Sequence, residues 1–196
     1  SGNNVLSSGI GTIASGDFST AMGINTSAIG QGSTAMGSST VASGLDSTAM
    51  GFDSEATGDG STAMGFDSEA TGNGSTAMGV FSQAIGLGST AMGWGYAEGI
   101  YSTAMGNGTS AIGGYSTAMG TVTNASGYAS TAMGEDTSAS GYASFAIGSS
   151  SYANGDGSVA MGLGASSVGL NSFAIGGSTA SGDFSTAMGI NTSAIG

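Results

Sequence analysis

The chain has 196 residues, 40 of them glycine, and contains no Lys, Arg, His, Pro or Cys. All 12 charged side chains are Asp or Glu, so its formal net charge is −12. Without basic residues it cannot neutralise phosphates, so nucleic acids and anionic membranes are excluded as expected partners. Without His, Lys or Cys it also lacks the usual general bases and nucleophiles of enzymes.

The first eight residues follow the later pattern only weakly, as expected for a fraying or capping end. From Gly9 onward, a half-unit of seven residues, x-x-Ser-x-Ala-x-Gly, is repeated. Its Ser and Ala alternate with variable positions, which is the period of a β-strand whose successive side chains point to opposite faces. A glycine at every seventh position removes the propensity that a helix needs, so we predict strands.

Two half-units make one coil of fourteen residues, and the sequence Ser-Thr-Ala-Met-Gly at 33–37 returns in variants once per coil. A short fixed period of this kind indicates a solenoid. We therefore predict an all-β fold, a parallel β-roll of two-strand coils. Each strand of about five residues is followed by a turn at Gly-x-x, such as 37–39, where glycine provides a positive φ. Residues 1–196 are predicted to form a single β-roll domain of about fourteen coils.

The glycine spacing shortens from seven to six at two places, near residues 94–99 and 177–182. At both, Ala97 and Ala180 keep their position two residues before the next glycine, so the missing residue belongs to a turn. Because a strand keeps its inward and outward faces only if its alternation is preserved, we predict that pairing survives both register slips. We expect no domain boundary at either.

The two strands of a coil differ at their outward positions. Ser and Ala are small, and we expect them to point into the coil, with the two sheets closer than the usual ~10 Å. The strand that contains Ser-Thr-Ala-Met-Gly then points Thr and Met outward. Its position before glycine holds all eleven methionines and otherwise Ile147 or Ile175. The opposite orientation, with Met inside and Ala outside, is the alternative.

A continuous Thr/Met stripe exceeds the apolar patch of a few hundred Å² that soluble monomers expose, and burying each Met contributes about 1.5–3 kcal/mol. We therefore predict an obligate oligomer in which other copies cover this stripe. Where Phe145 or Phe173 replaces Thr, the smaller Ile replaces Met, as expected if each pair fills a fixed volume. The predicted interface ladder consists of Thr34, Met36, Thr48, Met50, Thr62, Met64, Thr76, Met78, Thr90, Met92, Met105, Met119, Met133, Phe145, Ile147, Met161, Phe173, Ile175 and Met188.

Acidic and aromatic side chains supply the candidate ligand surface, which we predict to consist of Glu55, Glu69, Trp94, Tyr96 and Tyr101. The two glutamates stand one coil apart on the other strand, and the aromatic residues surround the first register slip. Turn aromatics either pack on the turn of a neighbouring coil or subunit, or form a binding patch. The stacked carboxylates could attract Ca²⁺, but the glycine-rich pattern of calcium-binding rolls is absent. No metal, cofactor or catalytic residue is therefore predicted.

The hexapeptides Asn-Ser-Phe-Ala-Ile-Gly at 171–176 and Gly-Ser-Val-Ala-Met-Gly at 157–162 resemble the head repeats of trimeric autotransporter adhesins of the Yersinia adhesin A type. The likeness extends from Gly9 to Gly196. It implies a homotrimer of left-handed β-rolls on the surface of a Gram-negative bacterium, anchored in the outer membrane through a C-terminal region that is absent here. This segment itself would make no direct membrane contact.

The function that the resemblance implies is cell adhesion and virulence without catalysis. The partners would be host extracellular-matrix or cell-surface proteins, and further copies of the chain, held by multivalent binding. Most coils carry Thr-Ala-Met instead of the family's Asn-Ser-Val-Ala-Ile, so the collagen binding of the best-known member is not carried over.

Two other interpretations remain open. The Thr ladder on a flat face is also typical of an ice-binding β-solenoid, although such a surface is expected to carry Thr where this chain has Met. A trimeric phage fibre segment would share the trimer but not the location. Residues 14–30 recur unchanged at 180–196 and the chain ends on a repeat boundary, so we expect a fragment of a longer adhesin.

Overall fold

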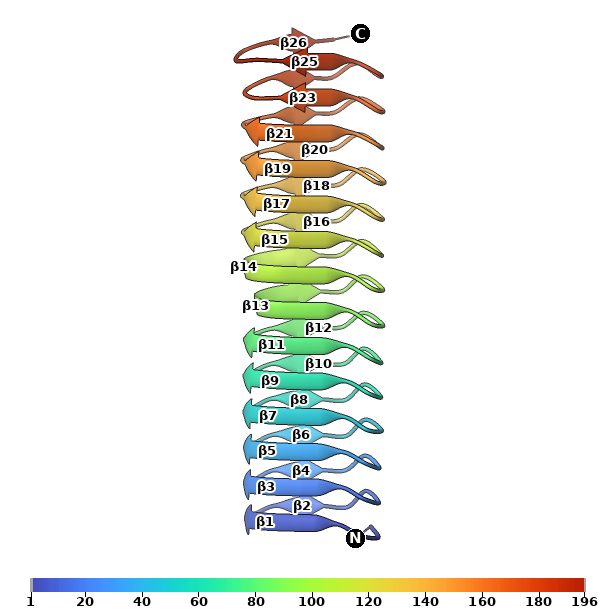
Figure 1. Cartoon of the computed structure of the whole chain (residues 1–196), viewed down its shortest axis with the longest axis vertical. Coiled ribbons are helices and arrows are strands. Elements are labelled where there is room, and N and C mark those ends of the chain that lie inside the picture. Colours follow the sequence, from blue (N-terminus) through green and yellow to red (C-terminus); the bar gives the residue numbers. More distant parts are fainter. Residues whose placement is uncertain (1, 196) are drawn as a thin grey trace. The chain divides into compact units, whose positions relative to one another are not determined.

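The computed structural model describes residues 2–195, which form strands and turns and no helix. These residues fall into two compact units that divide between Ala97 and Glu98. Within each unit the chain winds through successive coils whose strands are all parallel (Figure 1). The prediction of an all-β parallel β-solenoid is therefore confirmed, whereas the prediction of a single domain over residues 1–196 stays a prediction.

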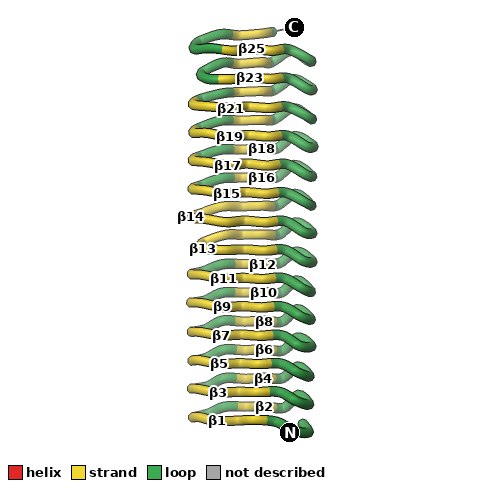
Figure 2. The backbone as a smooth tube through the Cα atoms, viewed as in Figure 1, coloured by secondary structure: helices red, strands yellow, loops and turns green. Residues whose placement is uncertain are grey.

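Long and short strands alternate along most of both units, as the tube in Figure 2 shows. The strands of the first unit are β1 (Leu6–Ile10), β2 (Ile13–Ala14), β3 (Thr20–Ile24), β4 (Ser27–Ala28), β5 (Thr34–Ser38), β6 (Val41–Ala42), β7 (Thr48–Phe52), β8 (Glu55–Ala56), β9 (Thr62–Phe66), β10 (Glu69–Ala70), β11 (Thr76–Val80), β12 (Gln83–Ala84) and β13 (Thr90–Ala97). The strands of the second are β14 (Thr103–Ala111), β15 (Thr117–Thr121), β16 (Asn124–Ala125), β17 (Thr131–Glu135), β18 (Ser138–Ala139), β19 (Phe145–Ser149), β20 (Tyr152–Ala153), β21 (Val159–Leu163), β22 (Ser166–Ser167), β23 (Phe173–Ile175), β24 (Thr179–Ala180), β25 (Thr186–Met188) and β26 (Ser193–Ala194).

Each strand pairs with the equivalent strand of the next coil, so like residues lie side by side. In the pairing of β5 with β7, Thr34 lies beside Thr48 and Met36 lies beside Met50. The sequence period thus becomes a set of columns of equivalent positions, and the inward columns hold almost only Ala, Ser and Thr. This register follows from the fourteen-residue repeat, because a slip of one residue would exchange the inward and outward faces.

The interior of each coil is made of alanine and serine. Ala35 and Ala49 are fully buried, as are Ser33 and Ser47. The same holds for the equivalent residues of most other coils, several of which have Thr in place of Ser. The predicted orientation, with Ser and Ala inside, is confirmed, and the alternative with Met inside is wrong.

The two strands of a coil are unequal in length, which the sequence analysis did not anticipate. The prediction of about five residues per strand fits the long strands, such as β9. It is wrong for the short strands, such as β10, which has two residues. After Ala70, the N–H groups of Thr71 and Gly72 both donate to the carbonyl of Ala84, at 3.0 and 3.3 Å. The regular ladder ends there, and the chain enters a turn closed by Ser75 N–H to the carbonyl of Gly72, 3.0 Å.

The repeated glycines are required mainly by close packing of the backbone. A Cβ on Gly37 would lie 1.9 Å from the carbonyl oxygen of Gly51, and one on Gly44 would lie 2.1 Å from that of Gly58. Gly37 has a φ of +124° but remains within β5, and the left-handed turn residue is Ser39, with a φ of 57°. The prediction that the turn begins at Gly37 is therefore corrected, because the strand continues through Ser38.

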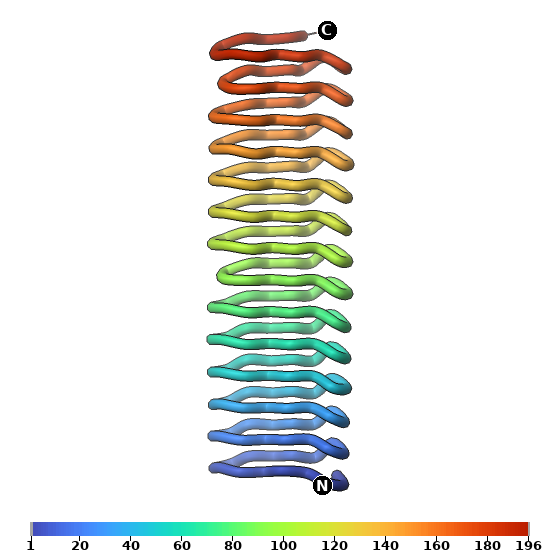
Figure 3. The backbone as a smooth tube through the Cα atoms, in the orientation of Figure 1, coloured from blue at the N-terminus to red at the C-terminus, as the bar shows by residue number. Residues whose placement is uncertain are grey.

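Pairing continues through both register slips, as predicted. In the first unit, Gln83 pairs with Tyr96 and Ala84 with Ala97. In the second unit, Ser166 pairs with Thr179 across the other slip. The chain absorbs the missing residue in the turn, which at both slips reaches less far out than its neighbours in the same unit (Figure 3).

Candidate functional site

Several acidic side chains in the turns hold one coil to the next. A carboxylate oxygen of Asp59 accepts the backbone N–H of Leu45 at 2.9 Å, and the side-chain oxygen of Asn73 accepts that of Asp59 at 3.1 Å. In the second unit, Asp156 accepts the N–H of Tyr142 in the same way, at 2.8 Å. These groups satisfy backbone donors that the strand ladder leaves unpaired, so their role is structural.

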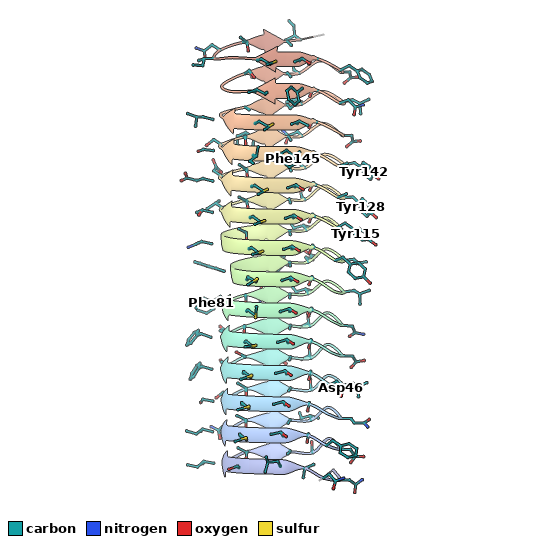
Figure 4. All side chains as sticks on the ribbon, viewed as in Figure 1. Asp46, Phe81, Tyr115, Tyr128, Tyr142 and Phe145 are labelled. Atoms are coloured by element: carbon teal, nitrogen blue, oxygen red, sulfur yellow. The ribbon has the colours of Figure 1, made fainter. Side chains whose placement is uncertain are left out.

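The outward face of the long strands carries the predicted interface ladder, which we call the Thr/Met face. Its side chains point away from the interior of the coil, and most of them are partly exposed. Met36 and Met50 are half-buried, and Met64 is 36% exposed. Phe145 projects from β19 on this face, beside Thr131 and Val159 (Figure 4). That other copies of the chain cover the Thr/Met face stays a prediction.

The outward face of the short strands is polar where the predicted ligand residues lie. Glu55 pairs with Glu69, and Glu69 pairs with Gln83, so the three side chains stand in a row. The amide nitrogen of Gln83 donates to a carboxylate oxygen of Glu69 at 3.0 Å. Tyr96 follows Gln83 in the same row. The row combines acidic and amide groups with one aromatic ring.

A column of aromatic rings lies in the first unit at the turns that follow the long strands. Phe52 stacks on Phe66 at a centroid distance of 5.1 Å, Phe66 meets Phe81 edge to face at 5.6 Å, and Phe81 lies 6.2 Å from Trp94. All four rings remain between 44% and 58% exposed. The rings therefore pack on neighbouring coils, one of the two expected roles of turn aromatics, and still offer surface to a ligand.

The second unit has a tyrosine column at the turns that follow the short strands. Consecutive rings of Tyr101, Tyr115, Tyr128 and Tyr142 lie 5.5–5.6 Å apart. Tyr115, Tyr128 and Tyr142 are labelled in Figure 4. Tyr101 thus packs on Tyr115, whereas Trp94 packs on Phe81 in its own unit. The grouping of Trp94, Tyr96 and Tyr101 in one ligand patch stays a prediction.

A surface hollow of about 340 Å³ lies in the first unit and is lined by Asp67, Phe81, Gln83 and Trp94. Of these, only Trp94 was predicted from the sequence to belong to the ligand surface. The available signal was the position of Phe81, which is one residue later in its turn than Phe52 and Phe66 and lies one coil before the slip. This signal combines a displaced aromatic residue with a shortened turn, and neither is unusual by itself.

A second polar contact in the second unit involves Tyr152 and Asp136. The phenol of Tyr152 donates to a carboxylate oxygen of Asp136 at 3.2 Å, and the hydroxyl of Ser150 donates to the same oxygen at 3.2 Å. The hydrogen bond to Asp136 and the negative charge of that carboxylate raise the pKa of Tyr152 above its ordinary value.

The described part of the chain has no group of side chains arranged to bind a metal ion. Among residues 2–195, no three or more His, Cys, Asp or Glu side chains are grouped so that they could hold a metal ion. No helix in the same range is long and apolar enough to span a membrane. The surfaces that remain for function are the Thr/Met face, the aromatic columns and the hollow.

A family model described as "YadA head domain repeat (2 copies)" matches this chain repeatedly. A comparison with curated proteins finds no match. The matched residues of the family model are 7–26, 14–40, 28–54, 42–68, 70–95, 97–122, 125–151, 153–179 and 177–192.

Proposed function

Because the chain belongs to the family of YadA head-domain repeats, an adhesin-type domain, we propose that it attaches a Gram-negative bacterium to host extracellular matrix or host cells. The single observation that carries this proposal is the family match, which spans most of the chain in successive copies. The same proposal places the head at the bacterial surface, with the outer-membrane anchor in another part of the protein. It assigns the head no catalytic step.

The proposal includes assembly of three chains into a homotrimer of left-handed rolls through the Thr/Met face. This face supports it because Thr and Met form columns along the long strands of each unit, and Phe, Val or Ile takes their place in parts of the second unit. Burial of a methionine contributes about 1.5–3 kcal/mol, and a repeated column multiplies that contribution. An association that depends on so many side chains would be obligatory rather than transient.

The exchange of side-chain volume on the Thr/Met face also supports a closely packed contact. Phe145 pairs with Thr131, and Ile147 of the same strand pairs with Met133. The large ring therefore enters where the neighbouring long side chain is shortened. A constant summed volume of the two side chains is expected where a second surface packs against them. Side chains that face solvent have no such limit on their volume.

The adhesive mechanism would be multivalent. A trimer presents three copies of each surface, and simultaneous engagement raises avidity without any new type of contact. Three copies would carry a formal charge of −36, three times that of one chain. This charge favours basic partners and makes binding weaker at higher salt.

Sedimentation analysis and a surface-binding assay together test the proposal. We expect a species three times the 18.4 kDa mass of one chain, and salt-sensitive binding to at least one immobilised extracellular-matrix protein or to host cells. A folded monomer would overturn the trimer, and a trimer that binds none of the tested surfaces would overturn the adhesive role. Inhibition of ice recrystallisation by the same sample would instead favour an ice-binding function.

A further inference from the structure

The hollow lined by Asp67, Phe81, Gln83 and Trp94 has the composition of a site for a cationic side chain. Two aromatic rings form part of its wall, since Phe81 and Trp94 lie 6.2 Å apart and are tilted by 53°. Asp67 adds a carboxylate to the lining, and Gln83 adds an amide. Aromatic faces and carboxylates both attract cations, so both kinds of lining group favour a cationic ligand.

The hollow arises where the turn geometry changes. Asp67 and Phe81 occupy the same left-handed turn position in successive coils, with φ values of 51° and 55°, and each donates its N–H to the preceding coil. In the following coil the turn is one residue shorter, and Trp94 lies within β13, which runs on to Ala97. At this slip the backbone reaches less far out than in the neighbouring coils (Figure 3). The hollow lies at the same place in the unit, with Phe81 and Trp94 in its lining.

The charge around the hollow has no basic counterpart among these 196 residues. They contain no Lys, Arg or His, so neither they nor the same residues of a second copy can place a basic side chain beside Asp67. Glu69, which accepts a hydrogen bond from Gln83 at 3.0 Å, adds a second carboxylate next to the hollow. A basic side chain must therefore come from outside these residues, which excludes contact between two copies of this segment as the source.

The dimensions favour one long side chain rather than a complete small molecule. A volume of about 340 Å³ in an open depression is at the lower end of the range for ligand pockets. Arginine fits this chemistry better than lysine, because its planar guanidinium stacks on aromatic faces and donates two parallel hydrogen bonds to a carboxylate. The neighbouring pair Phe52 and Phe66, with Asp53 and Glu55 beside it in sequence, continues the aromatic and acidic character along the unit.

We propose that this hollow binds an arginine side chain of an extended basic segment in a partner protein. The proposal rests on the adhesive function proposed above and names the chemical class of the ligand. The guanidinium would lie against Phe81 and Trp94 and pair with Asp67, while adjacent basic residues would face the acidic residues of the preceding coils. Each single contact is weak because it is exposed, so affinity depends on repetition along the segment and among the subunits.

The probe is a fluorescent peptide of alternating Arg and Ser, with a matched peptide in which neutral citrulline replaces Arg. Binding to the full chain is measured by fluorescence anisotropy at low and at physiological salt. We expect the citrulline peptide to bind at least about tenfold more weakly and a Lys peptide about threefold more weakly. Equal binding of the Arg and citrulline peptides would overturn the proposal, because charge would then have no role.

Two variants locate the binding, with one control of equal charge change. Asp67→Asn keeps a residue that tolerates the left-handed turn, and Trp94→Leu keeps an apolar side chain; each should weaken Arg-peptide binding about three- to tenfold. Glu135→Gln removes one exposed charge outside the hollow and should change binding less than about twofold. If Glu135→Gln weakened Arg-peptide binding as much as Asp67→Asn, the effect would be due to net charge alone, and the proposed site would be wrong.

The matrix-binding assay separates this inference from the adhesive proposal. If the protein binds matrix but the Arg peptide does not bind, the arginine site is wrong and adhesion stands. If the Arg peptide binds with the expected dependence on Asp67 and Trp94 but no matrix or cell surface is bound, the site stands and the adhesive role is wrong. Matrix binding that weakens in both variants but not in Glu135→Gln would support both.

Discussion

Residues 14–30 and 180–196 have the same sequence but lie in different surroundings. The first copy forms β3, which pairs with β1 on one side and β5 on the other. The second copy, described to residue 195, forms β25, which pairs with β23 alone among the described strands. The strand shortens from five residues to three, and Met188 is 61% exposed where Met22 is 37% exposed. The shortening begins at β23, which also has three residues although it pairs with both β21 and β25, so it accompanies the second slip and not only the lack of a partner.

The largest expected effect is a difference between two identical substitutions in this repeated sequence. A Cβ on Gly23 would lie 1.9 Å from the carbonyl oxygen of Gly37, whereas one on Gly189 meets nothing closer than Thr192 at 3.4 Å. Gly23→Ala should therefore cost about 4 kcal/mol or more, because backbone must move. Gly189→Ala should cost about 1–3 kcal/mol, since its φ of +115° is unfavourable for alanine.

Urea denaturation of both variants, with hydrogen exchange to locate the loss, measures this difference. Exchange in Gly23→Ala should increase in the coils that contain β3 and β5. Equal midpoints for the two variants would contradict the conclusion that contact with the next coil requires glycine.

The next effect compares the outward faces of a long and a short strand. Met119→Glu and Asn124→Glu each add one carboxylate to the outside of adjacent strands in the second unit. If the Thr/Met face is covered by other subunits, Met119→Glu removes about 1.5–3 kcal/mol of apolar burial per subunit and buries a charge. Sedimentation should then show dissociation for Met119→Glu and an unchanged assembly for Asn124→Glu. Two unchanged assemblies would show that the Thr/Met face is not the contact.

A smaller effect is expected for two serines at the same interior position of adjacent coils. The Ser47 hydroxyl donates to the carbonyl of Gly44 at 2.8 Å, whereas the buried Ser61 hydroxyl has no hydrogen-bond partner. Ser47→Ala should cost about 1 kcal/mol, and Ser61→Ala should be neutral or stabilise the fold by about 1 kcal/mol. Thermal denaturation of the two variants side by side measures the difference, and an equal loss of stability in both would contradict it.

The smallest effect concerns pH and the contact between Tyr152 and Asp136. Because the folded-state pKa of Tyr152 is raised above 10.0, its contribution to stability is present at lower pH and is lost as pH rises through the folded pKa. Carbon-13 NMR of labelled tyrosine should show Tyr152 titrating at lower pH in Asp136→Asn. Tyr152→Phe should remove this part of the stability loss at alkaline pH. An unchanged Tyr152 titration in Asp136→Asn would refute the role of the carboxylate.

Much of the fold could be predicted because the repeat constrains it at every coil. The alternation around Ala35 and Ala49 identified the interior, and the constant spacing identified the parallel register. The unequal strands could not be predicted, because Ala70 and Ala77 stand in similar local sequences and differ in the hydrogen bonds that follow them. Glycine was expected to provide a positive φ in the turns, whereas the main reason for it is close contact with the backbone of the next coil.

The candidate site was less predictable than the fold. Trp94 was identifiable because it is the only tryptophan and stands at a slip. Asp67 and Gln83 looked like ordinary polar residues, since nothing in their local sequence indicates that they approach the same hollow. Asp67, Gln83 and Trp94 belong to three successive coils, so they line one hollow only when these coils stack.

The sequence by itself determined the fourteen-residue coil, the small interior and the contrast between the Thr/Met face and the outward face of the short strands, because each depends on periodic composition. Only the tertiary structure decided where strands end, which hydroxyls find partners and where the aromatic columns leave a hollow. These features depend on hydrogen bonds and packing between neighbouring coils. The repeated sequence at 14–30 and 180–196 makes the reason plain, since identical residues form strands of different length when their neighbours differ.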